Sequence, residues 1–280
     1  MTRTCDVVTI PGGMRAIKDR ASGEVMHCGT GPGIEPSELY VVPSRLEERL
    51  RVAEGPALVL FDVGLGAASN ALAAWHVSEA LSGASRRLEI VSFDRNLDAL
   101  RLALEPENAA AFGLSEEHPR ARAAAMELVE HGAYETPRTS WRLVAGDFPT
   151  VLAREPTASA DIVYWDLYSP RSSPELWTLT QFLELRRACR DGATFHTYCS
   201  ATAVRSALLL AGFAVGLGTR SGDRPTTMAA TNVADLTTPL DARWLLRLGR
   251  SSAAFPPDVP LDETTRAQAL ARVRAHVQFT

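Results

Sequence analysis

The stretch of residues 57–70, Ala-Leu-Val-Leu-Phe-Asp-Val-Gly-Leu-Gly-Ala-Ala-Ser-Asn, constrains the fold of this chain most. An apolar run ends in Asp62, two glycines follow, and a helix-like pattern begins at once. This order predicts a strand, a tight turn and a helix at the ligand-binding edge of a doubly wound α/β domain. Gly64 and Gly66 allow a sharp backbone turn close to a ligand. Because Ser69 stands where the dinucleotide fingerprint has its third glycine, the pattern argues against a dinucleotide.

Four apolar runs of the sequence end in an aspartate, at Asp62, Asp94, Asp147 and Asp166. Parallel strands place their carboxyl ends at one edge of a sheet, where ligands bind, so we expect these acids to converge. A single acid at such a position is often a helix cap or a turn residue, but four in equivalent positions favour a ligand site. Asp94 ends the second strand, where a carboxylate can accept hydrogen bonds from two ribose hydroxyls.

The later part of the chain completes the predicted sheet. Residues 192–198 form a fifth apolar run, and the runs 213–218 and 227–232 are separated by a turn at 220–225. Strands joined only by a turn must pair antiparallel. The sequence therefore predicts a Rossmann-like α/β fold with a mostly parallel, seven-stranded sheet and an antiparallel last strand.

Three parts of the chain follow from this assignment. Residues 1–54 form an N-terminal extension, in which the glycine-rich segment 23–33 predicts a lid or substrate loop. Residues 55–237 form the core, and we expect residues 238–280 to be a C-terminal extension packed on it.

Composition limits the class of protein. No apolar run reaches the roughly 18 residues of a membrane span, and residues 1–10 lack the apolar core of a secretory leader, so we expect a cytoplasmic protein without membrane contact. The net charge of −4 opposes nucleic-acid binding by overall charge, although arginine clusters leave local basic surfaces open. The four cysteines lack the paired spacing of a metal site, so we assign no metal.

The turn at 62–66, Asp-Val-Gly-Leu-Gly, resembles the first motif of class I methyltransferases, whose cofactor S-adenosylmethionine carries no phosphate. From about Gly23 to Pro256 the chain resembles a narrower family, the methyltransferase domain of the bifunctional tRNA wobble-uridine enzyme MnmC and stand-alone relatives such as MnmD. The matching motifs are Gly23-Glu-Val-Met-His27, Gly31-Pro-Gly-Ile-Glu35, Asp62-Val-Gly-Leu-Gly66 with Asn70, Ser92-Phe-Asp94, Gly146-Asp-Phe148, Asp166-Leu-Tyr-Ser-Pro170, Pro174-Glu-Leu-Trp177, Thr197-Tyr198, Ala203-Val-Arg205 and Ala211-Gly-Phe213. Tyr168 replaces a phenylalanine, and Ser173 an asparagine, of the family pattern.

The resemblance implies a class I methyltransferase fold and roles for individual residues. The cofactor-binding set would be Asp62, Gly64, Gly66, Asn70, Asp94, Asp147, Phe148 and Asp166. In it, the glycines cradle the methionine moiety, Asp94 holds the ribose, and Asp147 faces the adenine amine with Phe148 beside it. The catalytic set would be Asp166, Tyr168, Ser169 and Tyr198, and the substrate contacts His27, Glu35 and Tyr168.

Methyl transfer to an amine is an in-line displacement, which requires a neutral nitrogen lone pair held at near-attack distance. The resemblance implies an S-adenosylmethionine-dependent N-methyltransferase acting on the 5-aminomethyl group of a tRNA wobble uridine. Because 280 residues leave no room for the flavin oxidase module of the bifunctional enzyme, we expect the methyltransferase alone. The alternative acceptor is a small-molecule or peptide amine, favoured by the acidic net charge and the altered motif. The four strand-end acids disfavour a cofactor-binding module without activity, and Ser69 disfavours a dehydrogenase.

Overall fold

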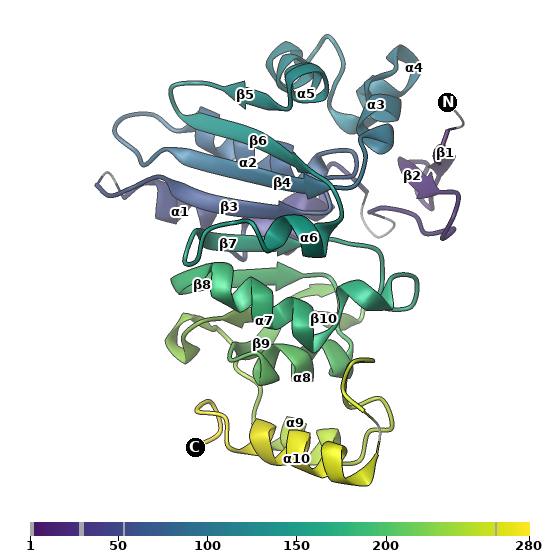
Figure 1. Ribbon diagram of the computed structural model, residues 1–280. Coiled ribbons are helices and arrows are strands. Elements are labelled where there is room, and N and C mark those ends of the chain that lie inside the picture. Colours follow the sequence, from purple (N-terminus) through teal and green to yellow (C-terminus); the bar gives the residue numbers. More distant parts are fainter. Residues whose placement is uncertain (1–2, 28–30, 53, 261) are drawn as a thin grey trace.

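The computed structural model describes residues 3–27, 31–52, 54–260 and 262–280, and its centre is one eight-stranded sheet (Figure 1). In spatial order the strands are β5 (Ala133–Glu135), β6 (Thr139–Ala145), β4 (Leu88–Asp94), β3 (Leu58–Val63), β7 (Ala160–Trp165), β8 (Cys189–Thr197), β10 (Arg224–Ala230) and β9 (Ala214–Ser221). The five strands from β6 to β8 are parallel, and β10 runs antiparallel to both of its neighbours. The predicted Rossmann-like class I methyltransferase fold is therefore confirmed.

The predicted strand count is one too low. The additional strand, β5, pairs antiparallel with β6 at the edge of the sheet. It has three residues, two of them exposed, and it directly follows helix α5 (Pro119–His131). So short an exposed strand buries too little apolar surface to leave an alternating pattern in the sequence.

Helices cover both faces of the sheet (Figure 1). The alternation of side chains along β3 shows why two cores form, since successive residues of a strand point to opposite faces. Leu58 and Leu60 pack with one group of helices, whereas Val59, Phe61 and Val63 pack with the other. The first group is η1 (Ser37–Val41), α1 (Leu46–Leu50), α2 (Ser69–Ala80), α3 (Asp98–Leu104), α4 (Pro106–Ala109), η2 (Ala110–Phe112) and α5. The second is α6 (Phe148–Leu152), η3 (Pro174–Leu176), α7 (Leu179–Ala188), α8 (Thr202–Leu210), α9 (Ala242–Leu248) and α10 (Glu263–Arg274).

The N-terminal residues form an antiparallel hairpin, β1 (Cys5–Thr9) with β2 (Arg15–Asp19), which lies beside the carboxyl ends of the central strands (Figure 1). The short helix η4 (Val233–Asp235) follows β10. Among the described residues, no helix is long and apolar enough to cross a membrane. Of the cysteines, Cys5, Cys189 and Cys199 are buried free thiols, while Cys28 and the rest of 28–30 lie outside the described residues.

Candidate active site

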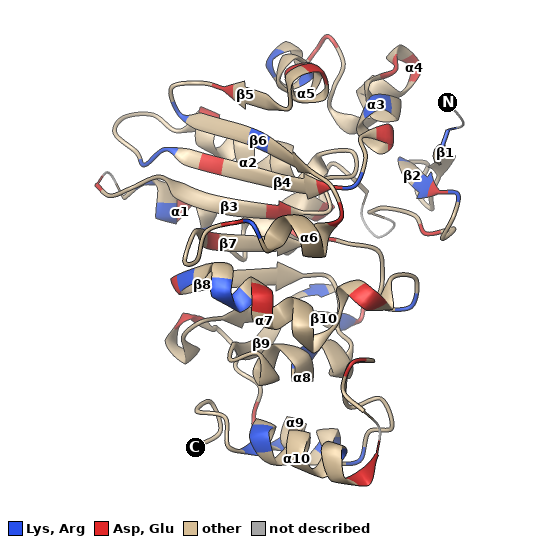
Figure 2. Cartoon of the chain, in the orientation of Figure 1, with Lys and Arg blue, Asp and Glu red and all other residues tan. Residues whose placement is uncertain are grey.

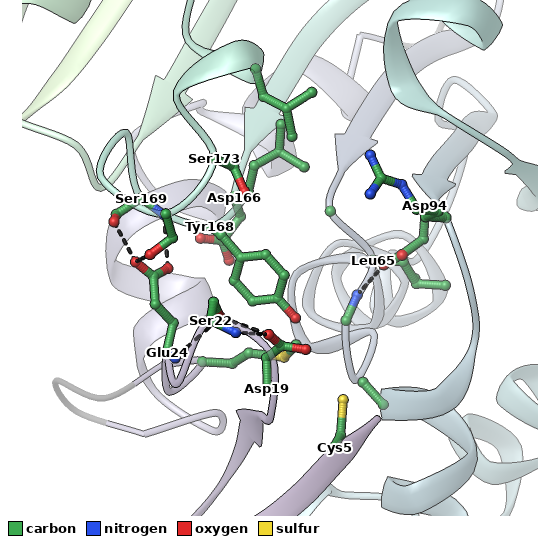
Figure 3. A pocket seen from close by; sticks show the side chains of 18 of the residues that line it. Cys5, Asp19, Ser22, Glu24, Leu65, Asp94, Asp166, Tyr168, Ser169 and Ser173 are labelled. Atoms are coloured by element: carbon green, nitrogen blue, oxygen red, sulfur yellow. Dashed lines mark hydrogen bonds between the residues drawn. The ribbon is translucent and has the colours of Figure 1, made fainter. Parts of the chain in front are cut away.

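A cavity of about 850 Å³ lies at the carboxyl edge of the sheet (Figure 3). The ends of β3, β4, β6, β7 and β8 line it from one side, and the segment after β2 lines it from the other. Of the residues expected in the site, the cavity is lined by His27, Glu35, Gly64, Gly66, Asp94, Phe148, Asp166, Tyr168, Ser169 and Tyr198. Asp62, Asn70 and Asp147 do not line it.

The glycine turn after β3 is tightly fitted. Gly64 has a φ of +94°, and a Cβ on it would lie 2.5 Å from the carbonyl oxygen of Asp166. Gly66 has a φ of +53°, and a Cβ there would lie 3.1 Å from the sulfur of Met26. Both glycines have a positive φ, and Gly64 also lies against backbone atoms of Asp166, which a side chain would not allow without strain. The turn therefore places bare backbone at the cavity wall.

Asp94, at the end of β4, faces the cavity and also braces the turn. Its Oδ2 accepts a hydrogen bond from the Gly66 N–H at 3.0 Å, and its Oδ1 accepts one from the Asn96 N–H at 3.2 Å. Burial raises the pKa of Asp94, although these backbone hydrogen bonds act in the opposite direction. The carboxylate is thus held at a fixed position beside the glycine turn.

Asp62 lies beneath the turn rather than in the cavity wall. It is 1% exposed, and its Oδ2 accepts a hydrogen bond of 2.7 Å from the Ser92 hydroxyl, which in turn accepts one from the Trp141 indole. Burial raises the pKa of Asp62 to about 7. Its Oδ1 is buried without a hydrogen-bond partner among the described residues, so it can accept a hydrogen bond from a further donor.

Asp166 is the centre of a polar cluster at the end of β7. Its Oδ2 accepts a hydrogen bond of 2.7 Å from the Asn70 side-chain amide, so Asn70 acts through Asp166 rather than on the cavity directly. His27 lies between two carboxylates, with Nε2 3.8 Å from Asp166 and Nδ1 3.8 Å from Glu35. Burial acts to lower the pKa of His27, but the hydrogen bond with Glu35 and the charge of Asp166 outweigh it, so the pKa is raised.

The loop after Asp166 is fixed by two aromatic side chains. The Tyr198 hydroxyl donates to the Leu167 carbonyl at 2.9 Å, and the Trp177 indole donates to the Tyr168 carbonyl at 2.8 Å. Burial raises the pKa of Tyr168, so its hydroxyl stays protonated at neutral pH. These contacts hold Tyr168 and Ser169 against the cavity.

Asp147 and Phe148 differ in their placement although they are neighbours in sequence. Phe148 is buried and packs edge-on against Phe93. The Asp147 side chain is 52% exposed; its carboxylate lies 3.1 Å from an Arg95 nitrogen and accepts a hydrogen bond from Thr150. The contact of Asp147 with an adenine amine stays a prediction.

Sequence reasoning missed two residues of the site. Glu24 accepts hydrogen bonds from Ser169 and Ser172, and Figure 3 shows Glu24 and Ser169 in contact at one side of the cavity. Tyr40 does not line the cavity, but its buried hydroxyl is close enough to Asp166 that burial and the Asp166 charge keep its pKa well above the ordinary value. The sequence signals for Glu24 are its place in the glycine-rich segment and in the motif Gly23-Glu-Val-Met-His27, neither of which assigned it a role. Within the described part of the chain, no group of three or more His, Cys, Asp or Glu side chains is arranged to hold a metal ion.

Comparison with protein families gives a match over residues 114–232 to a family described as S-adenosyl-L-methionine-dependent methyltransferase. The matched segment includes the ends of β6, β7 and β8, with Asp166 and Tyr198, but not the glycine turn of β3.

Curated relatives carry the description tRNA 5-methylaminomethyl-2-thiouridine biosynthesis bifunctional protein MnmC. The protein of Delftia acidovorans is 32% identical over 166 residues, which are 58% of this chain and 25% of the relative. The protein of Ralstonia nicotianae is 30% identical over 208 residues, 72% of this chain and 30% of the relative. The chain thus spans about a quarter to a third of the length of these relatives.

Two solved structures extend the comparison. MnmC2 from Aquifex aeolicus superposes with a TM-score of 0.73 and 25% identity, covering 97% of this chain and 86% of that one. Spermidine synthase from Thermotoga maritima superposes with a TM-score of 0.52 and 12% identity, covering 95% and 80%, which is a likeness of fold alone.

Proposed function

Because the chain belongs to the MnmC-like S-adenosyl-L-methionine-dependent methyltransferases, we propose that it methylates the 5-aminomethyl group of a tRNA wobble uridine. The observation that carries this proposal is the meeting of three groups at one cavity: the glycine turn of β3, Asp94 of β4 and Asp166 of β7. The first two suit a nucleoside with an amino-acid end, and the third suits an amine.

The residues present fit S-adenosylmethionine. Gly64 and Gly66 offer a backbone cradle that a Cβ would fill, and the unpartnered Oδ1 of Asp62 lies beneath this turn. Asp94 would accept hydrogen bonds from the ribose hydroxyls. The bound cofactor supplies a methyl group on a positively charged sulfur, and the carboxylates around the cavity favour that charge.

The chain's own contribution is to hold the acceptor nitrogen in line. Asp166 and the Ser169 oxygen would accept the two hydrogens of a neutral amine, which directs its lone pair along the line of attack. Asn70 and His27 hold Asp166 in place for this task. Transfer of the methyl group would form the N–C bond, break the C–S bond and leave a substituted ammonium, and Asp166 would take its surplus proton.

A small cationic amine is a second candidate acceptor, favoured by the charge of the cavity. Among the described lining residues, the carboxylates are Asp19, Glu24, Glu35, Asp94, Asp166 and Glu175, and the only arginine is Arg95. Figure 2 shows acidic residues near the carboxyl ends of β3 and β4. Such a lining attracts a cation and opposes a phosphate backbone.

Methyl transfer measured with labelled S-adenosylmethionine tests both acceptors. One reaction contains tRNA carrying 5-aminomethyl-2-thiouridine, and parallel reactions contain a panel of small primary amines. We expect label in the tRNA, and none in tRNA that lacks the aminomethyl group. Transfer to a small amine with none to the tRNA would replace the proposed acceptor by the second candidate.

Replacing Asp94 by alanine is expected to weaken binding of S-adenosylhomocysteine, the demethylated product, at least tenfold. The lost hydrogen bonds to a charged group are worth about 1.5–3 kcal/mol. Calorimetric titration measures the change, and Asp147→Ala tests the predicted adenine contact in the same way. Asp98→Ala is the control, because Asp98 lies four residues beyond Asp94 and does not line the cavity. An unchanged dissociation constant for Asp94→Ala would remove Asp94 from the cofactor site.

A further inference from the structure

Glu24 connects two walls of the cavity that are 145 residues apart in sequence. Its Oε2 accepts a hydrogen bond of 2.8 Å from the Ser169 N–H. Its Oε1 accepts hydrogen bonds from the Ser169 hydroxyl and, at 2.6 Å, from the Ser172 hydroxyl (Figure 3). Both carboxylate oxygens are therefore engaged by the loop of residues 166–173, which we call the acceptor loop.

The backbone around Glu24 is itself anchored. The Glu24 carbonyl accepts a hydrogen bond of 2.9 Å from the Asp19 N–H, and Val25 forms an antiparallel bridge with Lys18. The Met26 N–H donates to the Ile17 carbonyl at 2.8 Å. The segment that carries Glu24 is thus pinned to strand β2 and can serve as a fixed support.

The acceptor loop is held from two sides. The N–H groups of Ser172 and Ser173 both donate to the Ser169 carbonyl at 3.0 Å, so the loop forms a compact turn. The indole of Trp177 holds the turn from the α7 side. The three bonds to Glu24 hold it from the N-terminal side.

The chemistry of the pair fixes the role of the Ser169 hydroxyl. A carboxylate can only accept, so the hydroxyl must donate its hydrogen to Glu24, and its oxygen lone pairs remain as acceptors. Burial acts to raise the pKa of Glu24, but the bonds from Ser169 and Ser172 outweigh it and lower the pKa. Glu24 is therefore ionised at neutral pH.

We propose that Glu24 is a positioning residue for methyl transfer, which holds the acceptor loop closed and commits the Ser169 hydroxyl to accepting a hydrogen from the substrate amine. This role rests on the proposed function of the same site. Glu24 acts mainly through Ser169, because the three bonds from the loop occupy most of the roughly four acceptor sites of its carboxylate.

The test compares Glu24→Gln with a matched control. Glutamine keeps the size of the side chain, but its NH₂ group can only donate. Facing the Ser169 N–H it loses that bond, and facing the two hydroxyls it turns them into acceptors, so the Ser169 oxygen is no longer committed to the substrate amine and the charge-assisted bonds to the loop are weakened. Asp258 is the control, because it accepts bonds of 2.9, 2.9 and 3.0 Å from the Leu179 N–H, the Thr180 N–H and the Thr180 hydroxyl, outside the cavity. Asp258→Asn therefore removes the same charge from the same kind of contact.

For Glu24→Gln we expect kcat to fall about tenfold to a hundredfold, since misplacement of a reacting group by about 1 Å has effects of this size. The dissociation constant of S-adenosylhomocysteine should stay within about threefold, and Glu24→Asp should restore part of kcat. Limited trypsin cleavage after the exposed Arg171 should become several times faster, because the loop opens. Asp258→Asn should leave kcat and this cleavage rate unchanged.

Wild-type kcat together with wild-type cleavage after Arg171 in Glu24→Gln would refute the proposal. An equal loss of kcat in Asp258→Asn would reduce Glu24 to a general stabilising contact. Ser172→Ala removes one of the three bonds to Glu24 without a change of charge. If Glu24→Gln fails to fold, the kcat and cleavage rate of Ser172→Ala test whether the contact between Glu24 and the loop matters. If the wild-type protein methylates neither acceptor, the proposed function fails, whereas the cleavage rates still report on Glu24.

Discussion

Replacing Asp166 by asparagine is expected to lower kcat for methyl transfer about a hundredfold, with the affinity for S-adenosylhomocysteine changed by no more than a few-fold. Asparagine keeps the shape of the side chain, but one of its two ends becomes a donor. If the NH₂ group faces the substrate, it cannot accept a hydrogen from the amine. If it faces Asn70, it opposes the Asn70 amide, which donates to Asp166 at 2.7 Å in the wild-type protein. Single-turnover methyl transfer measures the loss.

Asp161 provides the control, because it lies at the opposite end of the same strand. Its Oδ2 accepts a hydrogen bond of 2.8 Å from the Val59 N–H and another of 2.6 Å from Arg190. Asp161→Asn should lower the melting temperature while leaving kcat of the folded protein intact. If Asp166→Asn behaves in the same way, Asp166 is a turn residue rather than a catalytic one.

Gly64→Ala is expected to reduce cofactor affinity about a hundredfold, equivalent to about 2.8 kcal/mol. At a φ of +94° an alanine costs about 1–2 kcal/mol in backbone conformation alone. Its Cβ would also lie 2.5 Å from the Asp166 carbonyl oxygen, so the ends of β3 and β7 must move apart. Titration with S-adenosylhomocysteine gives the affinity, and thermal melting gives the stability.

Gly212→Ala separates the backbone effect from the close contact. Gly212 has a φ of +89°, and a Cβ on it would meet no atom within 4 Å. Its alanine variant should therefore lose about 1–2 kcal/mol of stability through backbone conformation and keep its cofactor affinity. A Gly64→Ala variant that binds as tightly as Gly212→Ala would show that the turn does not shape the cofactor site.

The central sheet was predictable because its strands are long, apolar and buried on both faces. β3 is buried at every residue, and so is β7, which makes each an uninterrupted run bounded by polar residues. The hairpin of β1 and β2 leaves no such signal, because both five-residue strands are only partly buried. Its position beside the cavity depends on packing that local periodicity does not encode.

The site was predictable where a residue ends a buried strand, as Asp94 and Asp166 do. Position alone did not predict which strand-end acids line the cavity: Asp62 points beneath the turn, and Asp147 points towards Arg95 and solvent. Successive residues at a strand end face opposite directions, so a shift of one residue decides the outcome. The bonds of Glu24 to Ser169 join segments 145 residues apart, and a pattern within either segment does not indicate that the two side chains meet in the fold.

The support that Glu24 gives to the acceptor loop sets the order in which the enzyme matures. During synthesis, residues 15–27 leave the ribosome more than a hundred residues before Ser169 and Ser172. Contacts between segments so far apart in sequence form late, because closing the long chain segment between them costs entropy before the contact contributes favourable free energy. The segment that carries Glu24 therefore lacks its hydrogen-bond donors until strand β7 and the acceptor loop have been made. The glycine turn packs against the Asp166 carbonyl, so it too depends on residues that are made long after β3 and β4.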